Sequence, residues 1–213
     1  MSRAPEDPLP AEPFDEILAG RSPGFGVALD LHVRGRLSAY LAELDRWRRT
    51  TNLTGNLSPE DLADQALEGL VGSPLISDGE SVVDVGSGAG FPGLPLAIAR
   101  PRVRFTLVEP RARRVAFLRH IVRTVPLANV TVVEARIESV GGQTFDVAVT
   151  RAVGGFSDWL EGGRFLREGG RLLAWTTDSG AVAREIGAGF RLSRQVAVPG
   201  SQSRIVAVFT KAP

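Results

Sequence analysis

The sequence contains no cysteine, only one lysine, only two histidines, and no long apolar run. Without cysteine the chain can form no disulfide, thiolate nucleophile or cysteine-ligated metal site. His32 and His120 are too few for most zinc sites, so we expect no metal. No apolar run approaches the length of a membrane span, and the first residues lack the pattern of a secretory signal. We therefore expect a cytoplasmic protein.

The length of the chain limits its organisation. With 213 residues, of which 43% are hydrophobic, it can build one full core and a small appendage, but not two ordinary domains. Residues 1–30 are acidic, rich in proline at the start and short of periodic apolar positions. We expect a poorly ordered arm over 1–30, a helical extension over 31–77 and a ligand-binding domain over 78–213, in a monomeric enzyme.

Charge is unevenly distributed although the formal net charge is only +1. Between Arg100 and Arg123 the sequence holds eight arginines and one acid, Glu109. Such a stripe can bind a polyanion or can simply be a solvated helix face. Because arginine supplies nearly all basic residues of this chain, both interpretations remain open.

Periodicity predicts two helices before residue 78. Leu37, Tyr40, Leu41, Leu44 and Trp47 recur at spacings of three and four, which is typical of an amphipathic helix. A second helix is predicted to begin at Ser58, an N-cap residue that is followed by proline and acids.

From residue 78 onward, short apolar runs alternate with helical segments. This alternation predicts an α/β fold with a mostly parallel sheet that is covered on both faces. The last two runs are separated by "PGSQS", too short for a crossover, so they should form an antiparallel hairpin. The predicted strands are Ser81–Val85, Arg104–Val108, Asn129–Val133, Asp146–Thr150, Arg171–Thr176, Phe190–Val198 and Arg204–Thr210.

A glycine-rich turn, "DVGSGAGFPG", follows the first predicted strand. Gly88, Gly90 and Gly93 fit the dinucleotide fingerprint G-x-G-x-x-G, but the tighter unit is an aspartate, Asp84, followed by Gly-x-Gly-x-Gly from Gly86. A carboxylate at this strand end would repel a pyrophosphate. It suits S-adenosylmethionine, which carries an ammonium group and a sulfonium and has no phosphate.

Glu109 adds a second indication of a nucleoside ligand. It ends the second predicted strand, where a carboxylate can accept the hydroxyls of a ribose. Nicotinamide enzymes use the same device, so Glu109 does not choose between the two cofactors. Glycines that serve only a tight turn, capped by Asp84, are the structural alternative.

The chain is similar to a known family in several segments. "VVDVGSGAGFPG" resembles the cofactor loop of class I S-adenosylmethionine-dependent methyltransferases, and "GFPGLPLAI" resembles its continuation in the ribosomal RNA small subunit methyltransferase G family. "AYLAELDRWRRTTNLTG", "RARRVAFLRH", "ARIES" and "FDVAVTRAV" resemble further segments of that family. The resemblance covers roughly residues 36–175 and implies a Rossmann-like methyltransferase domain.

The resemblance also implies roles for individual residues. It implies N7-methylation of a guanine in small-subunit (16S) ribosomal RNA, with Gly86 and Phe91 lining the donor, Ile137 and Glu138 at its adenine end, and Arg151 closing the site. Phe91 and Ile137 could equally be core residues, and Glu138 a solvated acid. The main alternative for Arg151 is an ion pair with Asp146. The proposed donor site thus comprises Asp84, Gly86, Gly88, Gly90, Phe91, Glu109, Ile137, Glu138 and Arg151, with Arg151 also the catalytic candidate.

Guanine N7 carries a lone pair and no proton, so its methylation requires alignment and electrostatics rather than a general base. The chain has no cysteine for carbon methylation, and it has "TRAVGG" where exocyclic amine methyltransferases carry a Pro-Pro-aromatic motif. Two competing target atoms are therefore disfavoured.

Ribosomal RNA or the small subunit is the expected partner. Trp47 could stack on a base, although its position on the apolar stripe favours the core. Candidate phosphate contacts are Arg111, Arg113, Arg114, Arg119 and Arg123, with Arg46, Arg48 and Arg49.

Two segments depart from the family pattern. Residues 64–69, "DQALEG", stand where members usually carry Arg-His-x-x-Asp-Ser, and residues 175–179, "WTTDS", stand where they usually have lysine and glycine. Both changes remove positive charge from the expected RNA side. A divergent member acting on another acceptor, such as a small molecule, and a noncatalytic ribosome-associated module therefore remain as alternatives, and a nicotinamide reductase comes last.

Overall fold

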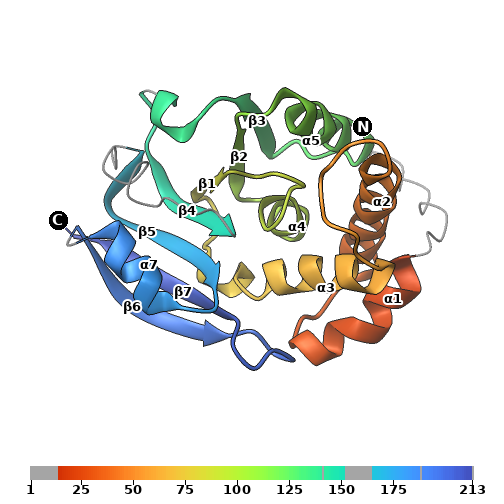
Figure 1. The fold of residues 1–213 in the computed structure, drawn as a ribbon, viewed down its shortest axis with the longest axis horizontal. Helices are drawn as coiled ribbons and strands as arrows, with labels where there is room; N and C mark the ends of the chain where they lie inside the picture. Colours follow the sequence, from red (N-terminus) through yellow and green to blue (C-terminus); the bar gives the residue numbers. More distant parts are fainter. Residues whose placement is uncertain (1–13, 141, 152–164, 188, 213) are drawn as a thin grey trace, which may run out of the picture.

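A seven-stranded sheet forms the centre of the computed structural model, which describes residues 14–140, 142–151, 165–187 and 189–212. The strand order is β3-β2-β1-β4-β5-β7-β6, as Figure 1 shows. The strands are β1 (Ser81–Val85), β2 (Arg104–Glu109), β3 (Val130–Glu134), β4 (Phe145–Arg151), β5 (Leu166–Thr176), β6 (Phe190–Ala197) and β7 (Ile205–Lys211).

The sheet confirms the predicted mixture of directions. Strands β1 to β5 pair in parallel, whereas β7 pairs antiparallel to both β5 and β6. All seven predicted strands are present, with ends that differ by at most one residue except at the start of β5. That strand begins earlier, at Leu166, because Leu166 pairs with Phe145 before the ladder is interrupted and resumes where Arg171 pairs with Val147. The interruption contains two consecutive glycines, which hid the first part of β5 from the apolar pattern.

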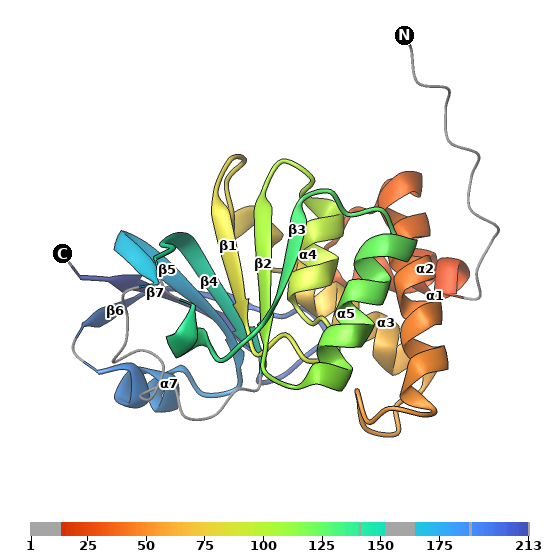
Figure 2. The ribbon, with the colours of Figure 1, turned by 90° about the horizontal axis from the view of Figure 1, so that it is seen from above.

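Helices cover both faces of the sheet. The helices α4 (Gly93–Ala99) and α5 (Ala112–Thr124) pack on one face, and α7 (Ser179–Ile186) packs on the other, as Figure 2 shows. Short 3-10 turns, η2 (Ser73–Leu75) and η3 (Ile137–Ser139), lie in connections. The fold is therefore the α/β, Rossmann-like arrangement that the alternation of strand and helix predicts.

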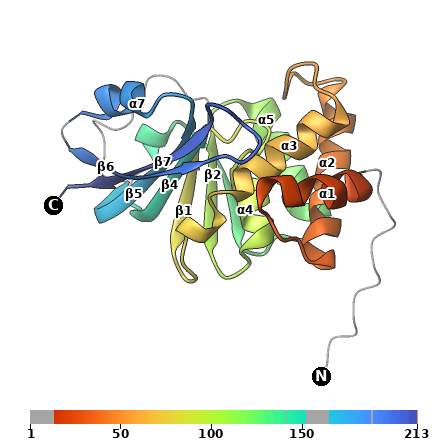
Figure 3. The same ribbon diagram turned by 90° about the horizontal axis from the view of Figure 1, so that it is seen from below.

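The N-terminal helices form a further layer outside α4 (Figure 3). They are α1 (Phe14–Arg21), the 3-10 helix η1 (Ser22–Phe25), α2 (Leu31–Arg48) and α3 (Pro59–Leu70). Helices α2 and α3 match the two predicted helices, and Ser58 caps α3 in a capping box with Asp61. The layer shares one apolar cluster with α4 and α5.

Residues 14–30 do not belong to a poorly ordered arm, so that expectation was wrong for this part; residues 1–13 lie outside the described residues. Phe14 and Leu18 are buried, and Arg34 on α2 donates a hydrogen bond to Asp15 at 2.8 Å. The helix α1 has only eight residues and buries two of them, which is too short a pattern for periodicity to reveal.

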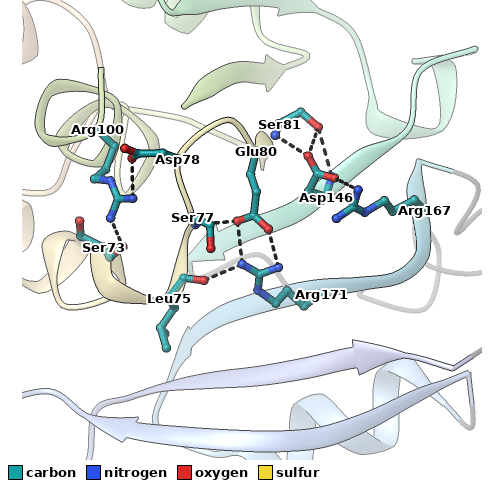
Figure 4. Close-up of polar contacts among 10 residues, drawn as sticks. All are labelled: Ser73, Leu75, Ser77, Asp78, Glu80, Ser81, Arg100, Asp146, Arg167 and Arg171. Atoms are coloured by element: carbon teal, nitrogen blue, oxygen red, sulfur yellow. Dashed lines mark hydrogen bonds and ion pairs between the residues drawn. The ribbon is translucent and has the colours of Figure 1, made fainter. Parts of the chain in front are cut away.

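A polar network ties the beginnings of three strands together (Figure 4). Arg171 on β5 makes two hydrogen bonds to the Glu80 carboxylate, at 2.9 and 2.7 Å, and a third to the Leu75 carbonyl at 2.7 Å. Burial acts to raise the pKa of Glu80, but the Arg171 guanidinium holds it below its ordinary value. At the start of β4, Asp146 accepts hydrogen bonds from Ser81 and pairs with Arg167.

The two β5 arginines should contribute unequally to stability. Arg171→Leu leaves the half-buried Glu80 carboxylate without its cation, so we expect the free energy of unfolding to fall by about 2 kcal/mol. Arg167→Leu is the matched control, because 57% of the Arg167 side chain is exposed, against 23% for Arg171. We expect it to cost less than about 1 kcal/mol. Urea unfolding measures both, and equal losses would contradict this account.

Candidate functional site

The glycine turn, residues 86–93, leaves the carboxyl end of β1 in a path that glycine alone allows. Gly86, Gly88 and Gly90 have φ values of 71°, 56° and 102°. These lie in the left-handed region, which residues with a side chain rarely adopt. At Gly93 the requirement is space, because an added Cβ would lie 2.4 Å from Oδ2 of Asp84. The turn therefore presents backbone without side chains to the pocket that it lines, where a ligand can approach it closely.

Asp84 lies beneath this turn and is only 1% exposed. Its Oδ2 accepts a hydrogen bond from the Gly93 amide at 3.2 Å, and its Oδ1 is buried with no hydrogen-bond partner among the described residues. Burial raises the pKa of Asp84 to about 7, and the nearby Glu109 carboxylate adds to the effect. Asp84 thus anchors the start of α4.

A cavity of about 530 Å³ lies beside the glycine turn, and we call it the turn cavity. Its wall combines the loop after α2, the turn itself, the β2–α5 connection and the end of β4. The expected site residues that line it are Gly86, Gly88, Phe91, Glu109 and Arg151. Segments that are far apart in the sequence thus meet at the carboxyl edge of the parallel strands, where ligands bind in such sheets.

Glu109 is 2% exposed and holds the two sides of the turn cavity together. One carboxylate oxygen accepts the Gly88 amide at 3.0 Å, and the other accepts the Arg111 amide at 2.9 Å. Arg114 approaches the same carboxylate at 3.9 Å. Because a carboxylate has about four acceptor sites, these contacts leave room for the hydroxyls of a ligand.

Arg151 ends β4 and lies at the wall of the turn cavity. Its guanidinium is 3.2 Å from the Glu68 carboxylate, donates to the Gln65 carbonyl at 3.3 Å, and has its central carbon 5.9 Å from the centre of the Phe91 ring. The alternative partner considered from the sequence, Asp146, instead pairs with Arg167 at the other end of β4.

Four expected residues do not line the turn cavity. Asp84 is buried below the turn, and Gly90 is a buried member of it; an added Cβ on Gly90 would lie 2.4 Å from a Leu94 side-chain carbon. Ile137 belongs to the apolar cluster on the α7 face of the sheet, and Glu138 is exposed. The last two lie on η3, directly after β3.

The two segments that depart from the expected family pattern contact each other. The Trp175 indole donates a hydrogen bond to the Glu68 carbonyl at 2.8 Å. Both acids of the first segment have arginine partners: Asp64 pairs with Arg21 on α1, and Glu68 pairs with Arg151 and Arg204. Their negative charges are therefore balanced locally, which the sequence comparison could not reveal.

Tyr40 is a site residue that sequence reasoning missed. This fully buried side chain on α2 donates its hydroxyl to the Ala89 carbonyl of the glycine turn at 2.8 Å, and its ring packs edge-on against Phe91 at 5.7 Å. Burial raises the pKa of Tyr40 well above its ordinary value. The only available signal was a single tyrosine within an apolar helical stripe.

The arginines of the two helices differ in their partners. On α2, Arg46 pairs with Glu43, while Arg48 and Arg49 share Asp45. On α5, Arg114 and Arg119 have acidic neighbours at 3.9 and 3.8 Å, and within the described ranges no ion pair involves the exposed residues Arg111, Arg113 and Arg123. Trp47 packs against Phe117 and His120, which supports its interpretation as a core residue.

The described residues contain neither a metal-binding cluster nor a membrane-spanning helix. Across the described ranges, we find no cluster of three or more histidine or acidic side chains that could bind a metal ion. In the same residues, no helix combines the length and apolar character needed to span a membrane.

The sequence is similar to that of one known protein family over most of its length. The family model described as rRNA small subunit methyltransferase G matches residues 34–184. The protein of that name from Pseudomonas aeruginosa (strain PAO1) is 34% identical over 198 residues, covering 89% of this chain and 91% of its own. The Desulfotalea psychrophila protein is 40% identical over 153 residues, covering 69% and 70%.

Solved structures share the fold at low sequence identity. A variant of MtNAS crystallised with S-adenosylmethionine has a TM-score of 0.63 and 16% identity, covering 85% of this chain and 75% of its own. An S-adenosylmethionine-dependent methyltransferase from Aquifex aeolicus has a TM-score of 0.57 and 16% identity, covering 81% and 98%.

The buried Asp84 carboxyl should make stability depend on pH. Its folded-state pKa of about 7 lies above the ordinary value of 3.8, so the parent's free energy of unfolding should fall as pH rises through this interval. Asp84→Asn removes this titration while leaving other groups in place. We expect the free energy of unfolding of the parent to fall relative to that of Asp84→Asn, by about 2 kcal/mol between about pH 5 and about pH 8. Urea unfolding across this range tests it, and parallel pH profiles would rule it out.

Proposed function

Because this chain belongs to the rRNA small subunit methyltransferase G family, we propose that it methylates guanine N7 in small-subunit (16S) ribosomal RNA. The enzyme is an S-adenosylmethionine-dependent methyltransferase. The observation that carries the finer proposal is that the glycine turn, Glu109 and Arg151 line one cavity. A nucleoside-binding carboxylate and a guanidinium suited to a nucleobase thereby share one wall. Its expected cytoplasmic location and monomeric state remain part of this proposal.

The residues of the turn cavity fit S-adenosylmethionine, which supplies an electrophilic methyl group when bound. The turn presents backbone without side chains at Gly86 and Gly88, and Glu109 retains acceptor sites for ribose hydroxyls. The buried Glu109 places a carboxylate near a ligand that is cationic. We propose that Gly90 binds the donor as part of the same turn and that Phe91 forms an apolar part of the cavity wall. We also propose that Ile137 and Glu138, both on η3, lie beside the adenine of the donor.

The composition of the cavity wall favours N7 as the target atom. Methylation at N7 needs no proton removal. Among the described residues, the lining of the turn cavity contains no histidine, tyrosine or lysine, and its carboxylate, Glu109, is already engaged by the Gly88 and Arg111 amides. The major-groove edge of guanine presents O6 beside N7, and arginine is a common donor to that edge. We propose that Arg151 orients the guanine through O6 and leaves N7 open to the methyl group.

The RNA backbone is proposed to cross the arginines at the start and along the outer side of α5. Arg111 and Arg114 line the turn cavity, while Arg113, Arg119 and Arg123 continue along the helix. Such contacts neutralise phosphates and position the RNA without reading its sequence. The α2 arginines are weaker candidates because acids on the same helix already pair with them.

Methyl transfer tests this proposal directly. Small ribosomal subunits and their extracted RNA, taken from a strain that lacks this protein, are incubated with labelled S-adenosylmethionine, digested, and analysed for the labelled nucleoside. We expect label in 7-methylguanosine. Arg151→Ala should lower kcat/KM at least about tenfold, because it removes a preorganised donor from the cavity wall. Arg167→Ala, an exposed arginine at the opposite end of the sheet, should leave the rate unchanged.

Other outcomes would identify other functions. Label in a different nucleoside would overturn the N7 assignment. Binding of S-adenosylhomocysteine without any labelled RNA would favour a different acceptor, such as a small molecule, or a noncatalytic module that retains the donor site.

A further inference from the structure

Glu68 on α3 is a buried carboxylate that the proposed chemistry has not used. Glu68 is only 5% exposed. Both carboxylate oxygens face arginines: Oε2 lies 3.2 Å from the Arg151 guanidinium, and Oε1 accepts a hydrogen bond from Arg204. A charge this far from water is stable only when it is paired and hydrogen-bonded. The three side chains come from α3, the end of β4 and the β6–β7 connection, so the cluster joins three separate parts of the fold.

Glu68 determines where the Arg151 guanidinium points. Both terminal nitrogens of that group are held from α3, Nη2 by the Glu68 carboxylate and Nη1 by the Gln65 carbonyl, and its central carbon lies over the Phe91 ring. Arg151 has few other orientations because only 18% of its side chain is exposed. Burial lowers the pKa of Arg151, and Glu68 counteracts that effect by stabilising the charged form.

The charge of Arg151 creates an electrostatic problem at this wall. A sulfonium donor is cationic, and a guanine methylated at N7 is also cationic, so positive charge is present in the cavity before and after transfer. An arginine without a counter-charge would repel both species. Arg151 can contribute hydrogen bonds at low electrostatic cost only if an anion stands behind it, and Glu68 is the acid in direct contact with it.

We propose that Glu68 is a positioning residue that aims Arg151 at the turn cavity and supplies the counter-charge that makes this guanidinium compatible with a cationic donor. The proposal rests on the proposed function, since the sulfonium belongs to S-adenosylmethionine. It also gives Trp175, in the second altered segment, a role, because its indole holds the Glu68 backbone; Asp64 lies one turn earlier on α3 with its own partner, Arg21, and takes no part.

The donor and its product provide a test that separates charge from structure. S-adenosylmethionine carries the sulfonium, whereas S-adenosylhomocysteine has the same shape without the methyl group and its positive charge. In Glu68→Gln we expect the Kd of S-adenosylmethionine to rise about fivefold relative to that of S-adenosylhomocysteine. Isothermal titration calorimetry on the full chain measures both constants. Asp64→Asn is the matched control, because it removes the same charge from the same helix outside the cavity wall, and its ratio should equal that of the parent.

Arg204→Gln provides a second measurement with the opposite sign. The Arg204 side chain is 52% exposed, so its replacement should be tolerated by the fold. Without the Arg204 guanidinium, Glu68 pairs with Arg151 alone, so the net charge behind Arg151 becomes more negative. We expect the affinity ratio to shift toward S-adenosylmethionine by about twofold. This variant decides the question if Glu68→Gln fails to fold.

The results distinguish this inference from the proposed function. Equal weakening of both ligands in Glu68→Gln would mean a purely structural role and would overturn the inference, as would an unchanged ratio in both variants. If the parent binds both ligands but methylates no ribosomal RNA, the proposed function fails, while the affinity ratio still measures the counter-charge.

Discussion

The close approach of helix α4 to strand β1 is the constraint on which the site depends. The Gly93 amide donates to Asp84 at a point where an added Cβ would be 2.4 Å from the carboxylate, so the helix can begin there only with glycine. A carboxylate at a helix N-terminus also interacts favourably with the unpaired amides. With both ends of the turn fixed in this way, the intervening residues must curve outward through left-handed conformations, and this path forms one wall of the cavity.

The N-terminal helices are part of the site and not an appendage to it. Helix α2 supports the turn from behind, through the Tyr40 hydroxyl on the Ala89 carbonyl. Helix α3 lies so close that an added Cβ on Gly69 would be 3.3 Å from the Pro92 side chain. The same helix supplies the carboxylate and carbonyl that hold Arg151. The division of the chain at residue 78 therefore describes the sequence pattern better than it describes the functional unit.

Local patterns predicted most of the fold, and long-range contacts account for what they could not predict. The strands and the helices α2 and α3 are recognisable because each carries its own periodicity or cap. The partner of Arg151 could not be found in this way, because Glu68 lies on a different element and neither residue has a local pattern that points to the other. Asp146 was the alternative because it is close in sequence, yet the two residues lie near opposite ends of β4, so the extended strand holds their side chains apart.

Charge on α3 illustrates why net charge along a sequence is a weak guide to a binding surface. Asp64, which stands where the family pattern has arginine, resembles a loss of positive potential when the segment is considered alone. Glu68 stands where the pattern already has an acid, and each of the two acids is matched by an arginine from another element. A polyanion or a cationic ligand responds to the charge that remains after such pairing, and the response depends on how far that charge is buried from solvent. By that criterion Glu68 tunes the cavity wall, whereas Asp64 is paired outside it and the exposed arginines beside and on α5 face the outer surface.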